Sequence, residues 1–379
     1  MLSHIWRINL ATMLFFMLIQ VVVPLIPRYA LTIGATPFFI GLAVSSISIT
    51  AILLRPVSGI ISDKWSRSKL MMLGLIFGAA AYAIMFLFSG IYSIMIARLI
   101  EGVGVALFIP SSMASAVDQA PQGKVGEALG WRSLMIGIGF SVGPALGGIL
   151  SEAFGYQPTF GITALLILLL LPMVMFREKR GAKNSGGICL DGLKNRSFIL
   201  ALSSLIIYAV AWMGLLTFLS AYLKLTGYGD LQIGLFVSIQ AVASLALRVW
   251  AGRVADRRPD VMTYAGLLII SLSFLVVAIE QVPPYLYIAS VIFGIGVGIF
   301  VPGSQTLALG HCPPNSRGFL SSIYTMGIDI GNLIGPVVFG AIIQSTGSYQ
   351  SSFMIAPILT FIAALSVLMP ARFKRQTKA

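Results

Sequence analysis

The sequence predicts an all-α membrane protein whose twelve transmembrane helices form two six-helix, pseudo-symmetric bundles. Three observations lead to this prediction. The 379 residues are 58% hydrophobic and 10% charged, with a mean hydropathy of +0.95, whereas about a quarter of the residues in a soluble domain are charged. Twelve apolar runs are long enough to cross a bilayer, and a charged pattern of the first half returns in the second.

Six of the apolar runs precede a charged segment in the middle of the chain, and six follow it. A spanning helix needs about 20 apolar residues, and each run comes close to that length. The expected spans are 6–28, 37–61, 70–90, 91–117, 125–150 and 157–176, then 197–223, 231–253, 261–279, 284–309, 317–343 and 350–370.

The segment between the halves, residues 177–196, is charged, glycine-rich and without apolar periodicity, so we expect a cytoplasmic linker. The linker divides the chain into an N-terminal bundle, 1–176, and a C-terminal bundle, 197–379. With both termini and the linker inside, nineteen Lys and Arg residues lie inside and only Arg28 and Lys224 lie outside. This bias predicts a multi-pass protein of the cell (inner or plasma) membrane with both termini cytoplasmic.

The formal net charge of +13 does not indicate a nucleic-acid partner, because the basic residues occur in short clusters between apolar runs, as in inside-facing loops. Two cysteines, Cys189 and Cys312, form no disulfide framework or metal motif. No cofactor and no metal are therefore expected. The N-terminal run lacks a convincing small-residue cleavage site, and we expect it to be the first span.

A repeat of the pattern Arg-x-x-x-Gly-x-x-x-Asp relates the two halves. It begins at Arg55 and again, 193 residues later, at Arg248, and Pro110 aligns with Pro302 at a similar offset of 192. Two helical units repeated in parallel, with a mobile interface between them, are associated with transport. Arg55 and Arg248 lie near the inner ends of their helices, and we expect both side chains to snorkel to the interface.

The loop after the second span resembles the signature G-x-x-x-D-[RK]-x-G-R-[KR] of the major facilitator superfamily, and the resemblance covers essentially the whole chain. Gly59, Asp63, Lys64 and Arg67 match, while serines replace the second glycine and the last basic residue. The resemblance implies a cytoplasmic latch in which Arg67 reaches Asp118 at the inner end of the fourth span. The second copy implies the same gating role for Gly252, Asp256 and Arg257.

The fifth span is similar to the pattern G-x8-G-x3-G-P-x2-G-G, which within the superfamily is associated with proton-coupled antiporters, especially twelve-helix drug exporters. Physically, the pattern provides a glycine face for close packing and a Gly-Pro bend. A partial copy that begins at Gly331 in the eleventh span favours a structural role as well. The matching residues of the fifth span are Gly130, Gly139, Gly143, Pro144, Gly147 and Gly148.

Two intramembrane acids are candidates for proton coupling. The fourth span resembles the family element R-x-x-Q-G-x-G, with Glu101 in place of the glutamine, so that an acid and Arg98 share one helix face. Glu101 lies about 15 Å into the bilayer, where Arg132 of the fifth span can approach it. A structural salt bridge is the alternative, but burial favours the neutral carboxyl and arginine favours the charged one, as proton coupling needs. Asp329 in the eleventh span is the second candidate, slightly less favoured.

The resemblance also implies that spans 1, 4, 7 and 10 line a central cavity. The first span ends in a P-x-x-P pattern, at Pro24 and Pro27, similar to that of drug exporters. Methionine, aromatic and amide side chains on these spans are candidates to contact a substrate, although such side chains more often serve packing. They are Met13, Met17, Gln20, Phe108, Trp212 and Gln305.

These features predict a secondary active transporter that works by alternating access, in proton-coupled efflux of amphipathic or drug-like small molecules. Its expected partners are a small-molecule substrate, protons and the lipid bilayer, and we expect a monomer. One alternative is an organic-anion or metabolite carrier of the same superfamily, in which Arg98 and Arg132 bind the substrate. A receptor or membrane-embedded enzyme would need a large soluble domain or a catalytic constellation, and the sequence has neither, nor any nucleotide-binding or hydrolase motif.

Overall fold

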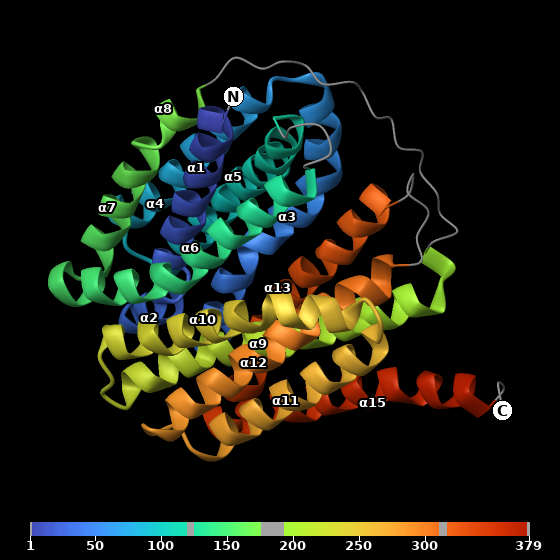
Figure 1. The fold of residues 1–379 in the computed structure, drawn as a ribbon. Coiled ribbons are helices and arrows are strands. Elements are labelled where there is room, and N and C mark those ends of the chain that lie inside the picture. The colour runs from blue at the N-terminus through green and yellow to red at the C-terminus, as the bar shows by residue number, and fades with distance from the viewer. Residues whose placement is uncertain (1, 120–124, 176–192, 311–316, 377–379) are drawn as a thin grey trace. The chain divides into compact units, whose positions relative to one another are not determined.

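A computed structural model of the chain describes residues 2–119, 125–175, 193–310 and 317–376, with side chains except at 2–5, 55–64, 125–128, 249, 317–319 and 369–376. Within this part of the chain, every element of regular secondary structure is a helix (Figure 1). The helices are α1 (Leu2–Val22), α2 (Leu25–Thr32), α3 (Pro37–Lys64), α4 (Arg67–Leu87), α5 (Ile91–Asp118), α6 (Val125–Phe154), α7 (Tyr156–Leu168), α8 (Leu171–Val174), α9 (Arg196–Leu225), α10 (Asp230–Ala255), α11 (Pro259–Ile279), α12 (Tyr285–Leu309), α13 (Arg317–Thr346), α14 (Tyr349–Phe353) and α15 (Ile355–Gln376).

Twelve helical stretches among the described residues are long and apolar enough to cross a membrane. They coincide with the twelve spans expected from the sequence to within a few residues, so the predicted fold class is confirmed. The first span, Trp6–Thr32, continues past its expected end at Arg28. The Arg28 side chain is buried in protein and donates to the Asp230 carboxylate.

Three spans consist of two consecutive helices, and each break lies near the residue four positions before a proline. The helices change over at Val23 for Pro27, at Leu168 for Pro172 and at Phe353 for Pro357. Proline has no N–H to donate to the carbonyl four residues earlier, and its ring crowds that carbonyl. Each of these three breaks therefore has a local cause, although a proline does not always interrupt a helix. The prolines at 110, 144, 302 and 336 lie inside uninterrupted helices.

Glycines let neighbouring helices approach closely inside each bundle. A methyl group added at Gly104 of α5 would lie 2.7 Å from the carbonyl oxygen of Gly74 in α4. In the later half, a methyl group at Gly266 of α11 would lie 2.5 Å from the Phe300 nitrogen in α12. Transmembrane helices associate through such small-residue contacts because lipid offers no hydrophobic driving force between them.

The chain divides into two compact units. The first contains residues 1–183 together with 220–238, and the second contains 184–219 together with 239–379. The first unit thus holds the α9–α10 connection besides α1 to α8. The division into bundles at 1–176 and 197–379, with a linker at 177–196, stays a prediction, and most of the linker lies outside the described residues.

Candidate functional site

A buried ion pair lies in the middle of α5. The Arg98 guanidinium donates to the Glu101 carboxylate at 2.7 Å, and the two side chains are 2% and 1% exposed. They are three residues apart, so the helix places both on one face. The pairing expected between these two residues is present.

Tyr82 of α4 completes the coordination of the Glu101 carboxylate. Its hydroxyl donates to the second carboxylate oxygen at 2.8 Å, and the tyrosine is fully buried. Arg98 also donates to the carbonyl oxygen of Val44 in α3 at 3.4 Å. Three helices therefore hold one carboxylate and its counter-charge within the membrane span. Tyr82 was not predicted from the sequence, because it carries no charge and reaches Glu101 from another helix.

Arg132 of α6 makes other contacts than the one expected. It donates to the Ile109 carbonyl oxygen at 3.2 Å and to the Ser112 hydroxyl at 2.9 Å, both on α5. In the described structure, the hydrogen bonds of Glu101 come from Arg98 and Tyr82. Arg132 therefore ties α6 to α5 at a position nearer the C-terminal end of α5 than the Glu101 pair. Its expected approach to Glu101 is not seen.

The other candidate acid, Asp329, lies on α13 and is 8% exposed. The same helix packs closely on α9, since a methyl group at Gly335 would lie 3.0 Å from the Gly214 nitrogen. Asp329 belongs to the second compact unit and Glu101 to the first. Burial of an acid in the span is consistent with its candidacy, which stays a prediction.

The glycine face of α6 packs on α1. A methyl group at Gly139 would lie 2.8 Å from the Met13 carbonyl oxygen, and one at Gly143 would lie 2.6 Å from the Gln20 Cβ. Gly147 meets the carbonyl of Val21 in the same way. The predicted cavity residues of α1 thus have their backbone in a helix–helix contact. The side chains of Met13 and Met17 are half-buried, and that of Gln20 is buried.

The other side of the same motif contacts the start of α10 within the first unit. A methyl group at Gly148 would lie 2.6 Å from the Asp230 carbonyl oxygen, and the carbonyl of Pro144 is close to Gly234. The amide of Ala145 donates to the Ser238 hydroxyl at 3.2 Å. Gly130 differs from the rest of the motif, because it is exposed and an added methyl group would meet no atom within 4 Å.

The remaining predicted cavity residues have different surroundings. Phe108 is fully buried against Phe15, with ring centroids 4.0 Å apart, so it is a core residue of the first unit. Trp212 is half-buried and stacks on Phe293 of α12 at 4.2 Å. Gln305 is exposed.

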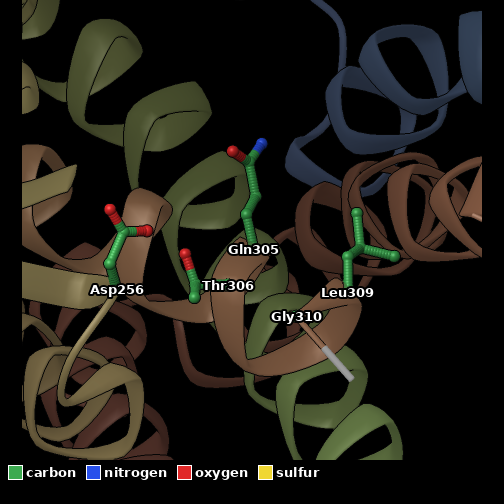
Figure 2. A pocket seen from close by; sticks show the side chains of 5 residues that line it. All are labelled: Asp256, Gln305, Thr306, Leu309 and Gly310. Atoms are coloured by element: carbon green, nitrogen blue, oxygen red, sulfur yellow. The ribbon is translucent and has the colours of Figure 1, made fainter. Parts of the chain in front are cut away.

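A shallow pocket of about 320 Å³ brings Gln305 and Asp256 together. Figure 2 shows the side chains of both extending to the same side, with Thr306 between them. Leu309 and Gly310 complete the lining. The pocket is open rather than enclosed, and it lies at the ends of α10 and α12.

The ion pair of the first predicted latch is present, and its gating role stays a prediction. Arg67 forms the expected ion pair with Asp118 and also donates to the Ala114 carbonyl oxygen at 2.7 Å. In the second copy, Asp256 and Arg257 are exposed, and Gly252 has open space beside it. For Gly59, Asp63 and Lys64 the structure describes the backbone alone, as the end of α3.

A second buried ion cluster, at the opposite ends of the helices, was not foreseen. Arg28 of α2, which is 0% exposed, donates to the Asp230 carboxylate at 2.7 Å. Lys224 and the Tyr156 hydroxyl donate to the same carboxylate, each at 3.1 Å. Glu152 accepts the Leu231 amide at 2.9 Å. The orientation expected from the sequence places both Arg28 and Lys224 outside. No local pattern in the sequence indicates that these two residues share an acid that is 202 residues from Arg28.

Comparison with known proteins decides the family. The family model described as Major Facilitator Superfamily matches residues 8–279 and 200–379, which together cover almost the whole chain. The chain belongs to the Major Facilitator Superfamily. It is therefore a multi-pass membrane transporter of small molecules and not an enzyme, as the sequence predicted.

Relatives in the superfamily include transporters with and without an assigned role. An uncharacterized MFS-type transporter of Methanocaldococcus jannaschii is 26% identical, over 96% of this chain and 97% of that protein. The multidrug resistance protein MdtG of a Rahnella species is 27% identical, over 92% and 88%.

Solved structures confirm the fold. A bacterial homolog of the human lysosomal transporter Spinster superposes with a TM-score of 0.83 at 15% identity, over 98% of this chain and 96% of that one. The nucleoside transporter NupG superposes with a TM-score of 0.76 at 15% identity, over 97% and 98%.

Proposed function

We propose that this superfamily member is a proton-coupled exporter of amphipathic, drug-like small molecules, which works by alternating access in the cell membrane with both termini cytoplasmic. Glu101 is the proton-carrying group in this proposal, and Arg98 is its counter-charge. The observation that carries it is the Arg98–Glu101–Tyr82 cluster, a carboxylate buried in the membrane span with both oxygens bonded. Intramembrane acids of this kind mark proton and substrate pathways by default.

Two further observations support export of drug-like compounds. The motif from Gly139 to Gly148 resembles the pattern of drug:proton antiporters, and its glycines pack α6 on α1 and α10. Several relatives that align over nine-tenths of the chain are named multidrug resistance proteins. The positive-inside bias supports the orientation.

The chemistry follows from the charges of the cluster. When a proton from outside binds Glu101, the carboxyl becomes neutral and Arg98 loses its counter-charge. A buried arginine without a counter-charge is costly, so the protonated cluster favours a different packing of α3, α4 and α5 from the ionised one. The proton leaves when Arg98 returns to the carboxylate. Asp329 is the second candidate for the same step.

Gating is proposed to use the ion pairs at the two ends of the helices. Arg28 and Asp230 come from the two sequence repeats, so opening a path to the outside has to separate this buried pair. The Arg67–Asp118 pair lies at the cytoplasmic end and would hold α4 to α5 there. Each closed end is thus stabilised by ionic contacts that the open end gives up.

Replacing Glu101 tests the proposal. Purified protein is reconstituted into liposomes with ethidium, a cation, and anilinonaphthalene sulfonate, an anion, as fluorescent probes. Wild type should accumulate at least one probe under an imposed pH gradient and should also catalyse counterflow without a gradient. Glu101→Gln should lose the pH-driven transport and keep counterflow, because the variant cannot exchange a proton but retains the binding site.

Glu280→Gln is the matched control, since Glu280 is exposed at the end of α11. This variant should transport as wild type does. Unchanged pH-driven transport by Glu101→Gln would exclude Glu101, and the same assay with Asp329→Asn then tests the other acid.

The organic-anion or metabolite carrier is the second candidate. Arg132 supports it, because its hydrogen bonds in the described structure go to a carbonyl and a hydroxyl rather than to an acid. Arg98 does not support it, because Glu101 already neutralises its charge. Stabilisation against heat by anionic rather than cationic ligands, lost in Arg132→Gln, would favour this carrier function.

A further inference from the structure

One face of α10 carries three polar side chains, each with a buried atom that has no hydrogen-bond partner among the described residues. Gln240, Ser244 and Arg248 are spaced by four residues, so they follow one another along the same side of the helix over about 12 Å. Gln240 and Ser244 are 9% and 4% exposed, and Arg248 is half-buried. In the described structure, the Gln240 Oε1, Ser244 Oγ and Arg248 Nε atoms are buried without a hydrogen bond.

Arg28, Arg98 and Arg132 each have one buried nitrogen without a hydrogen bond as well, but each of these three arginines also has a bonded partner. Arg28 is paired with Asp230 and Arg98 with Glu101, while Arg132 donates to a carbonyl and a hydroxyl. Buried polar groups in proteins are nearly always bonded, and each exception needs an explanation. Arg248 is half-buried, and its expected snorkelling to the interface stays a prediction, but the buried Nε needs an acceptor in either case. An anion from outside the chain would supply the missing partner.

Aromatic rings flank this cation inside the second compact unit. Tyr208 of α9 is close enough to Arg248 for an electrostatic interaction. The Tyr208 ring lies 5.0 Å from the Phe300 ring and 6.4 Å from the Phe293 ring, the latter at an interplanar angle of 17°. Trp212, one turn further along α9, stacks on Phe293 at 4.2 Å. Rings from α9 and α12 therefore form one aromatic cluster, which includes the tyrosine that interacts with Arg248.

We propose that Arg248, with Ser244 and Gln240, binds the anionic group of an amphipathic aromatic substrate whose apolar body lies along Tyr208 and Trp212. A guanidinium binds a carboxylate or sulfonate through two parallel hydrogen bonds, and ring faces bind planar apolar groups. The proposal rests on the proposed transport function and narrows its substrate class to aromatic anions. It assigns to the second repeat the charge recognition that the carrier alternative gave to Arg98 and Arg132.

The phosphate of an anionic lipid offers Arg248 the same oxygen chemistry. Binding of a lipid phosphate and binding of an aromatic anion should depend differently on the aromatic rings and on the residues in the middle of α10. A lipid headgroup would require only Arg248 at the membrane surface, whereas an aromatic anion should also depend on Tyr208 and Gln240. The backbone of α10 at Gln240 and Ser244 contacts the glycine face of α12, at Gly294 and Gly298, which places this stretch of the helix inside the bundle rather than against lipid.

Equilibrium binding without a pH gradient tests the proposal separately from proton coupling. The full-length protein is purified in a neutral detergent, and binding of naphthoate, anthracene carboxylate and anilinonaphthalene sulfonate is measured by calorimetry. Naphthylmethylammonium is the size-matched cation. At least one anion should bind about tenfold or more tightly than the cation, and Arg248→Gln should weaken its binding about tenfold or more, as expected for loss of a charge-assisted contact.

Three variants and one lipid separate the outcomes. Arg253→Gln removes an exposed arginine from the same helix and should bind as wild type does. Arg248→Lys should recover part of the affinity and shows that the position tolerates change, and Gln240→Leu should weaken anion binding without altering the charge. No Arg248-dependent binding by any of the three anions would overturn the proposal. So would Arg248-dependent stabilisation by phosphatidylglycerol vesicles in the absence of aromatic-anion binding, which would assign the site to lipid. Neither outcome bears on the proton-coupling proposal, which the pH-driven transport of Glu101→Gln tests separately.

Discussion

Gly143 offers a sharp test of why the fifth span is rich in glycine. An added methyl group at Gly143 would lie 2.6 Å from the Gln20 Cβ, whereas two carbons rest about 3.5–4.0 Å apart. Gly143→Ala therefore has to push α6 and α1 apart by about 1 Å. Forcing extra methyl groups into packed cores costs about 1–3 kcal/mol.

Gly130→Ala is the matched control on the same helix. An added methyl group there meets no atom within 4 Å, and alanine favours a helix over glycine by about 1 kcal/mol. The helical preference acts in both variants, so the difference between them isolates the packing term. We expect Gly143→Ala to unfold at a lower temperature than wild type and Gly130→Ala to unfold at the same or a higher temperature.

The assay is thermal unfolding of both variants in one detergent, followed by tryptophan fluorescence, with transport measured in parallel. The free energies of unfolding should differ by about 1–3 kcal/mol. Equal stability of the two variants would refute the packing explanation. Normal stability of Gly143→Ala combined with loss of transport would instead assign this glycine to a conformational change.

Two other substitutions test the buried polar clusters. Tyr82→Phe leaves one Glu101 oxygen without its donor, so it should lower the free energy of unfolding by about 1–3 kcal/mol and slow pH-driven transport more than counterflow. Tyr92→Phe, at an exposed tyrosine, should change neither the stability nor the transport. Equal effects of the two variants would contradict the role of the Tyr82 hydroxyl. Asp230→Asn leaves Arg28 buried without a counter-charge and should lower the free energy of unfolding by about 3–5 kcal/mol, measured by thermal unfolding. The double variant with Arg28→Gln should lose less stability than the sum of the losses in the two single variants. Additive losses would mean that the pair is not coupled.

The helices were predictable because their signals are local. Apolar length alone located twelve spans. A proline four residues later accounts for the breaks at Val23, Leu168 and Phe353, but four other prolines leave their helices unbroken, so the breaks themselves were not predicted. The Arg98–Glu101 pair was predictable for the same reason, since both residues lie one turn apart on one helix.

Contacts between helices were harder to predict. Depth in the bilayer suggested that Arg132 could meet Glu101, but depth does not give the direction of a side chain around its helix, and Arg132 bonds to Ile109 and Ser112 instead. Tyr82 and the Arg28–Asp230 pair depend on how helices pack. The internal repeat does not pair Arg28 with Asp230, which is 202 positions away, and no other pattern in the sequence does. The cavity residues on α1 were chosen by type, and type does not distinguish the face that packs on α6.

Proton release on substrate binding tests the central claim most directly. Purified protein in weakly buffered detergent solution is mixed with a saturating probe ligand, and a pH dye reports the protons released. If substrate and proton compete through Glu101, wild type should release up to about one proton per bound ligand. Glu101→Gln should bind the ligand and release none. Equal release by wild type and Glu101→Gln would contradict the assignment of Glu101 as the proton-carrying group.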